Sequence, residues 1–325
     1  MRAVRTGERA AGAAGLVVTD APYPHASEND VIVRVHAAGF TPGELGWPGT
    51  WTDRAGRDRA PSIPGHEVSG VVAELGYGTT GLTVGQRVFG LTDWTRDGTL
   101  AEYVAVEARN LAPLPATVSH LSAAALPISG LTAWQGLFDH GRLAVGQRVL
   151  IHGAGGGVGS LAIQLAHQAG AYVIATGRAR DRAIATELGA HAFLDLDADR
   201  LADAGQVDLV LDVIGGEVLA ASAAQVRPGG TLVTIAAPPT VSPAGGRALF
   251  FIVEPDRHRL ADLAHRVHEG RLRPLVSTVH PLADAPHAFT APRTAPGKPI
   301  IQVIETEPET EPELESEAAA GAAGA

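Results

Sequence analysis

The chain has 325 residues, of which 45% are hydrophobic and 18% are charged, as in a globular protein with one large or two medium-sized domains. It contains no cysteine, which excludes disulfides and thiolate metal sites. No apolar run approaches the ~18 residues of a membrane-spanning helix. The N-terminus lacks the apolar core of a signal peptide. We therefore expect a cytoplasmic protein that has no membrane partner.

The acidic residues are unevenly distributed along the chain. Residues 305–325 contain seven Glu and no Lys or Arg. Removing those seven from the formal net charge of −10 leaves −3 for residues 1–304. This nearly neutral part predicts no nucleic-acid partner, because no large basic field is available. Glu alternates with Pro and Thr in the final segment, which predicts a disordered acidic tail. A functional acidic tail is the alternative.

The first part of the chain has the sequence pattern of a β-domain. Short apolar runs occupy residues 30–40, 68–75, 85–91 and 100–106, and the first of them alternates with period two. Gly-rich and Pro-containing turns separate these runs. Short strands between such turns predict a compact β-domain.

From about Leu121, strand and helix patterns alternate. We expect strands over 149–151, 171–177, 208–216 and 230–238, and helices over 160–170, 178–189 and 216–230. The strands are apolar throughout, which is typical of a parallel sheet covered on both faces. A last short strand, 297–305, resembles the first half. The predicted fold class is therefore α/β. One domain comprises residues 1–120 with 272–304, and the other comprises residues 121–271.

The stretch "HGAGGGVGS" lies between a predicted strand and a predicted helix, as in a dinucleotide-binding βαβ unit. Ala154 stands where the first glycine of the motif is expected, and Gly156 and Gly159 supply the others. The phosphates would rest on the helix N-terminus, where backbone N–H groups are free. A tight turn without a ligand is the alternative. The predicted cofactor contacts of this loop are Gly153, Ala154, Gly156, Gly157, Val158 and Gly159.

The end of the next predicted strand bears on the choice between NAD and NADP. An acidic residue there would bind the ribose 2′-hydroxyl of NAD. The chain instead has Gly177 at this position, followed by Arg178, Arg180 and Arg182. Guanidinium groups can bind a 2′-phosphate, which favours NADP(H). A solvated basic helix start is the alternative, although cations disfavour a helix N-terminus.

Five segments together resemble the medium-chain dehydrogenase/reductase superfamily, and within it the zinc-independent quinone oxidoreductase branch. They are "AAGFTPGEL", "IPGHEVSGVV", "LPISGLTAWQGL", "VLIHGAGGGVG" and "GKPIIQV". The resemblance covers residues 1–304. It implies a GroES-like β-domain and a Rossmann domain with the active site between them. It also implies NADPH as the hydride donor and a homodimer.

The residues at the zinc-ligand positions of related alcohol dehydrogenases are Thr41, His66 and Ile128, as the resemblance aligns them. A catalytic zinc needs three protein ligands and an open position. One surviving imidazole cannot hold the ion, so we expect no metal. His66 is then interpreted as a polar residue that lines the substrate pocket.

Without a Lewis acid, hydride transfer to a quinone or an α,β-unsaturated carbonyl is the favoured chemistry, because the charge delocalises onto oxygen. Thr41 stands where the related enzymes often carry Asn, so it is predicted to orient the substrate or, alternatively, to stabilise the turn. Trp47, Trp51 and Trp94 are predicted to form an aromatic wall or, alternatively, to pack structurally.

The resemblance adds further cofactor contacts. Thr132 matches a Thr near the nicotinamide, and Asp212 and Ile235 match strand ends that line the cofactor cleft. Lys298 is predicted to contact the cofactor or, alternatively, to be a surface lysine. Two other functions stay open at this point. One is an enoyl reductase of a biosynthetic pathway, and the other is an NADPH-binding protein without turnover.

Overall fold

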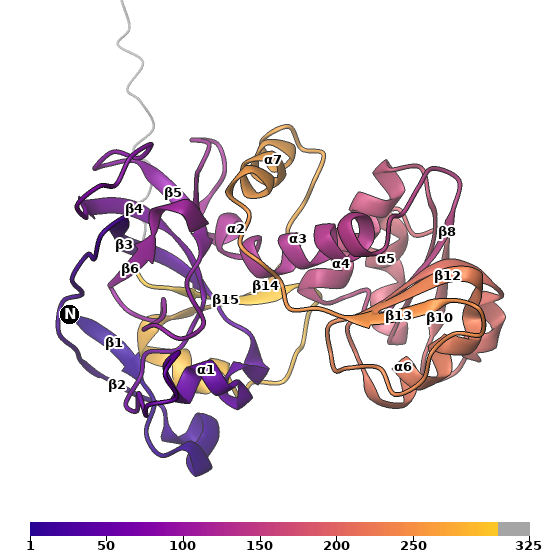
Figure 1. Cartoon of the computed structure of the whole chain (residues 1–325), viewed down its shortest axis with the longest axis horizontal. Helices are drawn as coiled ribbons and strands as arrows, with labels where there is room; N and C mark the ends of the chain where they lie inside the picture. The colour runs from indigo at the N-terminus through magenta and orange to yellow at the C-terminus, as the bar shows by residue number, and fades with distance from the viewer. Residues whose placement is uncertain (305–325) are drawn as a thin grey trace, which may run out of the picture.

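The computed structural model describes residues 1–304, which form two lobes joined side by side (Figure 1). The predicted disordered tail, 305–325, lies outside the described residues. The strands are β1 (Arg2–Arg5), β2 (Val17–Asp20), β3 (Asp30–Gly39), β4 (Glu67–Leu75), β5 (Arg87–Leu91), β6 (Tyr103–Glu107), β7 (Leu111–Pro113), β8 (Arg148–Ile151), β9 (Tyr172–Gly177), β10 (Ala192–Asp195), β11 (Val207–Asp212), β12 (Val226–Thr234), β13 (Arg247–Phe250), β14 (Val276–Pro281) and β15 (Lys298–Gln302). The α-helices are α1 (Pro48–Trp51), α2 (His120–Ala124), α3 (Pro127–Trp134), α4 (Gly157–Gln168), α5 (Arg182–Glu187), α6 (Gly216–Ser222), α7 (Arg257–His268) and α8 (Ala285–Ala288).

One lobe is built on a six-stranded parallel sheet with the order β10-β9-β8-β11-β12-β13. Counted from β8, this order is 3-2-1-4-5-6, the arrangement of dinucleotide-binding Rossmann domains. The order in which strands are added to the sheet reverses at β8, because β9 and β10 lie on one side of β8 and β11 to β13 lie on the other. Ligands bind at such a reversal, outside the carboxyl ends of the strands. The order therefore places the glycine loop, which follows β8, at the expected binding position.

The other lobe contains a seven-stranded mixed sheet with the path β14-β15-β3-β4-β5-β7, to which β6 is added by pairing with β3. The last strand, β15, pairs antiparallel with β3, so the chain returns to this lobe after the parallel sheet, as the sequence predicts. The α/β fold with a GroES-like β-domain and a Rossmann domain is confirmed. The domain boundaries at residues 120 and 271 stay predictions.

Two predicted helices are shorter than the sequence pattern suggests. Residues 216–230 were expected to be one helix, but α6 ends at Ser222 and β12 begins at Val226. Val226 pairs with Val207 of β11, and the strand contains Pro228, which cannot continue a helix. Likewise, the helix expected over 178–189 begins with a 3-10 turn, and α5 itself covers Arg182–Glu187.

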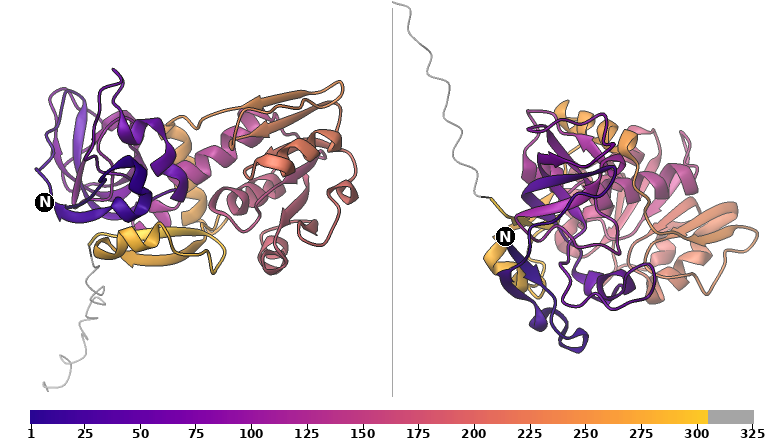
Figure 2. Two further views of the ribbon diagram at one scale, coloured as in Figure 1. Left: turned by 90° about the horizontal axis from the view of Figure 1, so that it is seen from below. Right: turned by 60° about the vertical axis from the view of Figure 1, so that its left-hand side comes forward.

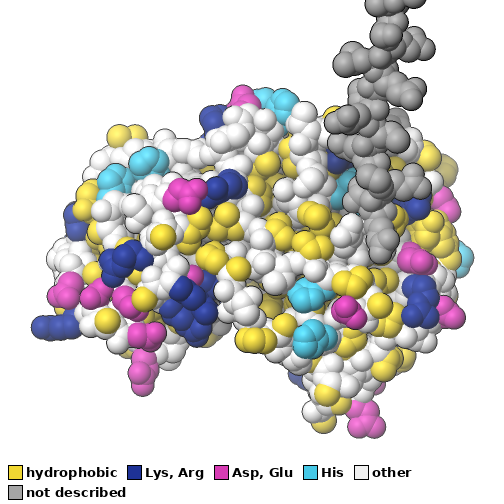
Figure 3. All heavy atoms as spheres, turned by 180° about the vertical axis from the view of Figure 1, so that it is seen from behind, with side chains coloured by type: hydrophobic (Ala, Val, Ile, Leu, Met, Phe, Trp, Pro, Cys, Tyr) yellow, Lys and Arg dark blue, Asp and Glu magenta, His cyan; other side chains and the backbone are white. Residues whose placement is uncertain are grey.

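The two lobes meet along α2, α3 and the start of α4, with β14 and β15 running beneath them (Figures 1 and 2). Seen from behind, Lys and Arg side chains alternate with Asp and Glu over both lobes (Figure 3). Within residues 1–304, no helix is long and apolar enough to cross a membrane.

Candidate active site

A cavity of about 1050 Å³ lies between the two lobes and takes its walls from both. Gly157 and Val158 line it from the glycine loop, and Thr41, Trp47 and Trp94 line it from the other lobe. A further wall comes from the segment that follows β12 and from the chain at and beyond the end of β13. The lining residues from the parallel-sheet half of the chain also include Ile128, Ser129, Thr132, Ile235, Ala236, Phe250, Phe251, Ile252 and Val253.

The glycine loop is shaped to receive a phosphate. The first i→i−4 bond of α4 runs from the Ser160 N–H to the Gly156 carbonyl at 3.0 Å, so the N–H groups of residues 157–159 precede the intrahelical bonds. A Cβ at Gly159 would overlap the carbonyl oxygen of Gly153, so helix and loop approach each other more closely than any other residue allows. The residues present therefore fit a dinucleotide, whose pyrophosphate the loop and the N-terminus of α4 would hold.

The turn from Thr41 to Glu44 is held from beneath by a buried carboxylate. Glu44 is 0% exposed, and its two oxygens accept the N–H groups of Gly65 at 2.6 Å and Thr41 at 3.1 Å. Burial raises the pKa of Glu44 to about 7, against the lowering effect of these two hydrogen bonds. The turn therefore depends on an acid that titrates near neutral pH.

Lys298 is oriented toward a carboxylate of its own lobe. Its ammonium forms an ion pair with Glu67, and the two side chains are 7% and 0% exposed. The other oxygen of Glu67 accepts the N–H of Ile128, the residue at one of the zinc-ligand positions, at 2.9 Å. Lys298 does line the cavity, and its stem lies beside Gly157. The structure therefore leaves space for the predicted contact between Lys298 and the cofactor, although the ammonium is already paired with Glu67.

His66 lies behind the cavity wall, which differs from the expectation that it lines the pocket. It is 1% exposed, and its ring packs against Trp47 at 5.9 Å and Trp94 at 5.0 Å between centroids. Its Nδ1 is 3.1 Å from the hydroxyl of Thr92. Burial, together with the nearby charge of Arg59, lowers the pKa of His66 to about 3, so the imidazole is neutral. The two indoles occupy the positions that face the cavity.

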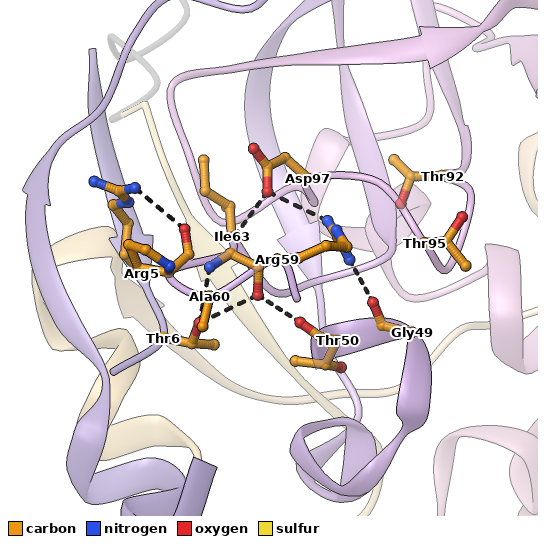
Figure 4. Close-up of polar contacts among 12 residues, drawn as sticks. Arg5, Thr6, Gly49, Thr50, Arg59, Ala60, Ile63, Thr92, Thr95 and Asp97 are labelled. Carbon is orange, nitrogen blue, oxygen red and sulfur yellow. Dashed lines mark hydrogen bonds and ion pairs between the residues drawn. The ribbon is translucent and has the colours of Figure 1, made fainter. Parts of the chain in front are cut away.

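A polar network fastens the segment around Gly49 and Thr50, which also carries Trp47 and Trp51, to the residues around Arg59 and Asp97 (Figure 4). The Arg59 guanidinium reaches the carbonyl oxygen of Gly49, a cavity residue, and lies 3.3 Å from Asp97. Ser62 extends the network, because its hydroxyl donates to the Thr50 carbonyl at 2.6 Å. We infer that this network fixes the part of the cavity wall that the GroES-like lobe contributes.

Three other predicted residues lie away from the cavity lining. Trp51 is 5% exposed and donates its indole N–H to the Leu45 carbonyl at 2.7 Å, so it supports the loop from inside. Asp212 is fully buried and accepts the N–H groups of Ile214 and Gly215 at 3.2 and 3.1 Å, so it closes the turn after β11. Arg182 donates to the Phe193 carbonyl at 3.0 Å. Each of these groups is occupied by a structural contact within its own lobe.

The predicted residues therefore separate into two groups. The cavity brings together Thr41, Trp47, Trp94, Thr132, Gly157, Val158, Ile235 and Lys298. Other positions of the glycine loop and the end of β9 lie outside its lining, namely Gly153, Ala154, Gly156, Gly159, Gly177 and Arg178. Arg178 is exposed at the end of β9, where a cofactor phosphate could reach it.

Several cavity residues gave no signal in the sequence. Arg293, Thr278 and His280 come from the C-terminal part of the chain, and the His280 ring lies 3.1 Å from the Thr278 hydroxyl. Glu44 and Asp181 do not line the cavity, but both carboxylates are buried, which their local sequence does not indicate. No short motif marks Arg293, Thr278 and His280, because the fold brings them to the cavity from a distant part of the sequence.

The donors at the three zinc-ligand positions do not fit a catalytic zinc. Thr41, His66 and Ile128 supply one imidazole, and a zinc site needs three protein ligands. Among residues 1–304, no three His, Asp or Glu side chains gather as a metal-binding group. We therefore derive no step through a metal.

Fold and site together define an oxidoreductase with a dinucleotide-binding lobe and a GroES-like lobe. The family of alcohol dehydrogenase GroES-like domains matches residues 27–116, and the zinc-binding dehydrogenase family matches residues 188–298. The chain belongs to the medium-chain dehydrogenase/reductase superfamily, and within it is quinone oxidoreductase-like.

Similar proteins differ in how much of their length is matched. The 2-methylene-furan-3-one reductase of Solanum lycopersicum is 32% identical over 274 residues, which cover 80% of this chain and 67% of that protein. The spectinabilin polyketide synthase system protein NorB of Streptomyces orinoci is 37% identical over 244 residues, and this match covers 69% of the chain but 11% of that protein. The solved quinone oxidoreductase from Coxiella burnetii superposes with a TM-score of 0.84 at 29% identity, covering 94% and 99% of the two chains.

Proposed function

We propose that this protein is an NADPH-dependent, zinc-independent reductase of quinones or α,β-unsaturated carbonyls. The observation that carries the proposal is one cavity that is lined both by Gly157 and Val158 of the glycine loop and by Thr41, Trp47 and Trp94 of the other lobe. A dinucleotide on the loop and a flat acceptor against the indoles would share this space. The names of the tomato reductase and of the Coxiella quinone oxidoreductase support the same class of substrate.

When bound, the dinucleotide supplies the hydride. The residues of this chain bind the dinucleotide and orient the acceptor. The N-terminus of α4 would hold the pyrophosphate. The indoles of Trp47 and Trp94 meet edge to face at 87°, and they form an apolar corner against which an aromatic or conjugated acceptor can pack. The Thr41 hydroxyl is a donor for the oxygen on which negative charge develops. Phe250, Phe251 and neighbouring apolar residues limit the access of water.

The preference for NADPH over NADH is assigned to Arg178. Arg182 donates to the Phe193 carbonyl and lies 3.5 Å from Asp199, so its guanidinium is already engaged by residues of its own lobe. Arg178→Glu should weaken the binding of NADPH more than the binding of NADH, as measured by fluorescence titration. Arg182→Glu makes the same charge change and serves as the control. Equal weakening of both dinucleotides by Arg178→Glu would contradict the 2′-phosphate assignment.

A second candidate is the reduction of enoyl thioesters in a biosynthetic pathway. The observation that favours it is the 37% identity to part of a polyketide synthase system protein. A homodimer is also proposed, through the edge strand β13 and the residues that follow it, where Phe250 and Ile252 are 37% and 65% exposed. Sedimentation at several concentrations tests it, and a monomer throughout would contradict it.

The test of the function is a set of acceptors offered to EDTA-treated protein with NADPH. The set contains a benzoquinone, a naphthoquinone, an alkyl enal and an enoyl thioester, and NADPH oxidation is followed at 340 nm. Turnover of a quinone or the enal supports the leading proposal, whereas turnover of the thioester alone supports the second. Binding of NADPH without turnover of any acceptor would contradict both and favour a binding protein.

A further inference from the structure

An ion pair between the two lobes lies directly on the glycine loop. The Arg293 guanidinium is 2.8 Å from a carboxylate oxygen of Asp181, and the two side chains are 37% and 5% exposed. Asp181 follows β9 in the parallel-sheet lobe, whereas Arg293 belongs to the segment between α8 and β15 of the other lobe. A Cβ at Gly155 would overlap both charged groups. The pair therefore touches the backbone of the loop that receives the cofactor.

A second contact fixes the same segment to the same glycine. The N–H of Gly297 donates to the carbonyl of Gly155 at 2.8 Å, so residues 293–297 are attached to the loop at two points. Asp181 also lies against the end of β9, because a Cβ at Gly177 would be 3.1 Å from its second oxygen. In this fold the pyrophosphate sits at the glycine loop and the adenosine half points toward the end of the second strand, here β9. The ion pair thus lies along the path of the dinucleotide.

We propose that Arg293 is a pyrophosphate ligand of the dinucleotide and that Asp181 is its internal competitor. The inference rests on the proposed dinucleotide function. The planar fork of a guanidinium binds carboxylate and phosphate with the same geometry, so either group can take it. Arg293 lines the cavity and is partly exposed, so it can change partner without unfolding. Asp181 keeps the N–H of Arg178 as a donor, at 3.3 Å, when Arg293 leaves.

The competition predicts opposite effects for the two partners. Arg293→Gln removes the phosphate ligand and should weaken dinucleotide binding about tenfold or more. Asp181→Asn keeps the size of the side chain and an oxygen acceptor for the Arg178 N–H, but it loses the charge that holds Arg293. A larger fraction of molecules then has Arg293 available, and the apparent dissociation constant falls by the same factor, about threefold to tenfold. In the double variant, Asp181→Asn should have no effect, because its influence acts through Arg293.

The experiment is a fluorescence titration of NADPH and NADH against the wild type, both single variants and the double variant. Stopped-flow association rates are measured on the same proteins. The control is Arg273→Gln, which removes an exposed ion pair with Glu187, 2.8 Å long, at side chains that are 52% and 60% exposed. Tighter binding of both dinucleotides to Asp181→Asn, and weaker binding to Arg293→Gln, is the expected result.

Three outcomes would overturn the inference. If both single variants weaken binding to the same extent, the ion pair has a structural role and holds the two lobes in place. If Arg293→Gln weakens only NADPH, the residue contacts the 2′-phosphate and not the pyrophosphate. If Asp181→Asn binds like the wild type, there is no competition. Failure of the proposed function itself looks different, because the wild type would then bind neither dinucleotide.

Discussion

Replacement of Glu44 by Gln should change how the stability of the protein depends on pH. Burial raises the pKa of this carboxyl from 4.5 to about 7, so the folded protein holds its proton over a range in which the unfolded chain has lost it. The stability that the protonated group contributes is present below pH 4.5 and is lost as the pH rises through about 7. Integration over this range makes the wild-type free energy of unfolding about 2–3 kcal/mol smaller at pH 8 than at pH 5 on account of Glu44.

Glu44→Gln does not titrate, so this contribution should disappear. The assay is urea unfolding of wild type and variant at pH 5 and pH 8, at one ionic strength. The difference in unfolding free energy, variant minus wild type, should be about 2–3 kcal/mol more favourable to the variant at pH 8 than at pH 5. Glu28→Gln, at an exposed position in the same lobe, is the control and should show no such change. A difference for Glu44→Gln that is the same at both pH values would refute the argument.

Three further predictions concern the residues around the cavity. Gly159→Ala places a methyl group against the loop carbonyl and should weaken NADPH binding at least tenfold by titration, whereas Gly46→Ala, with no atom within 4 Å of the new methyl, should not. Lys298→Met leaves the buried Glu67 carboxylate unpaired and should cost about 3–5 kcal/mol in urea unfolding. Adding Glu67→Gln should recover much of that loss, and an unchanged loss would argue against the pair. The His66 ring protons should show no titration between pH 5 and pH 8 in NMR spectra, and a midpoint near 6.5 would contradict its burial.

The sequence was sufficient to predict the two lobes, because their signals are local and periodic. The apolar run into "HGAGGGVGS" and the helix after it predict one βαβ unit, and β8, the loop and α4 form it. Alternating strands and helices predict the parallel sheet for the same reason. The return of β15 was also predicted, from the likeness of "GKPIIQV" to the strands of the first half.

The direction of individual side chains could not be predicted in the same way. The run of arginines after Gly177 suggested several phosphate ligands, yet Arg182 lies over the Phe193 ring at 4.8 Å, because that ring and a backbone carbonyl provide a nearer partner. Trp51 turns inward because Leu45 offers an acceptor for its N–H. The contact between Asp181 and Arg293 joins residues 112 positions apart, and no local pattern marks such a pair.

The central claim is that this chain transfers a hydride from NADPH without a metal. The measurement that tests it most directly is the single-turnover decay of NADPH absorbance in EDTA-treated protein, with the acceptor from the panel that reacts fastest. NADPH carrying deuterium at one or the other C4 position is compared with unlabelled NADPH. The account predicts a decay that EDTA leaves unchanged and that slows for one of the two deuterated forms. A decay that EDTA abolishes, or bound NADPH that no acceptor oxidises, would contradict it.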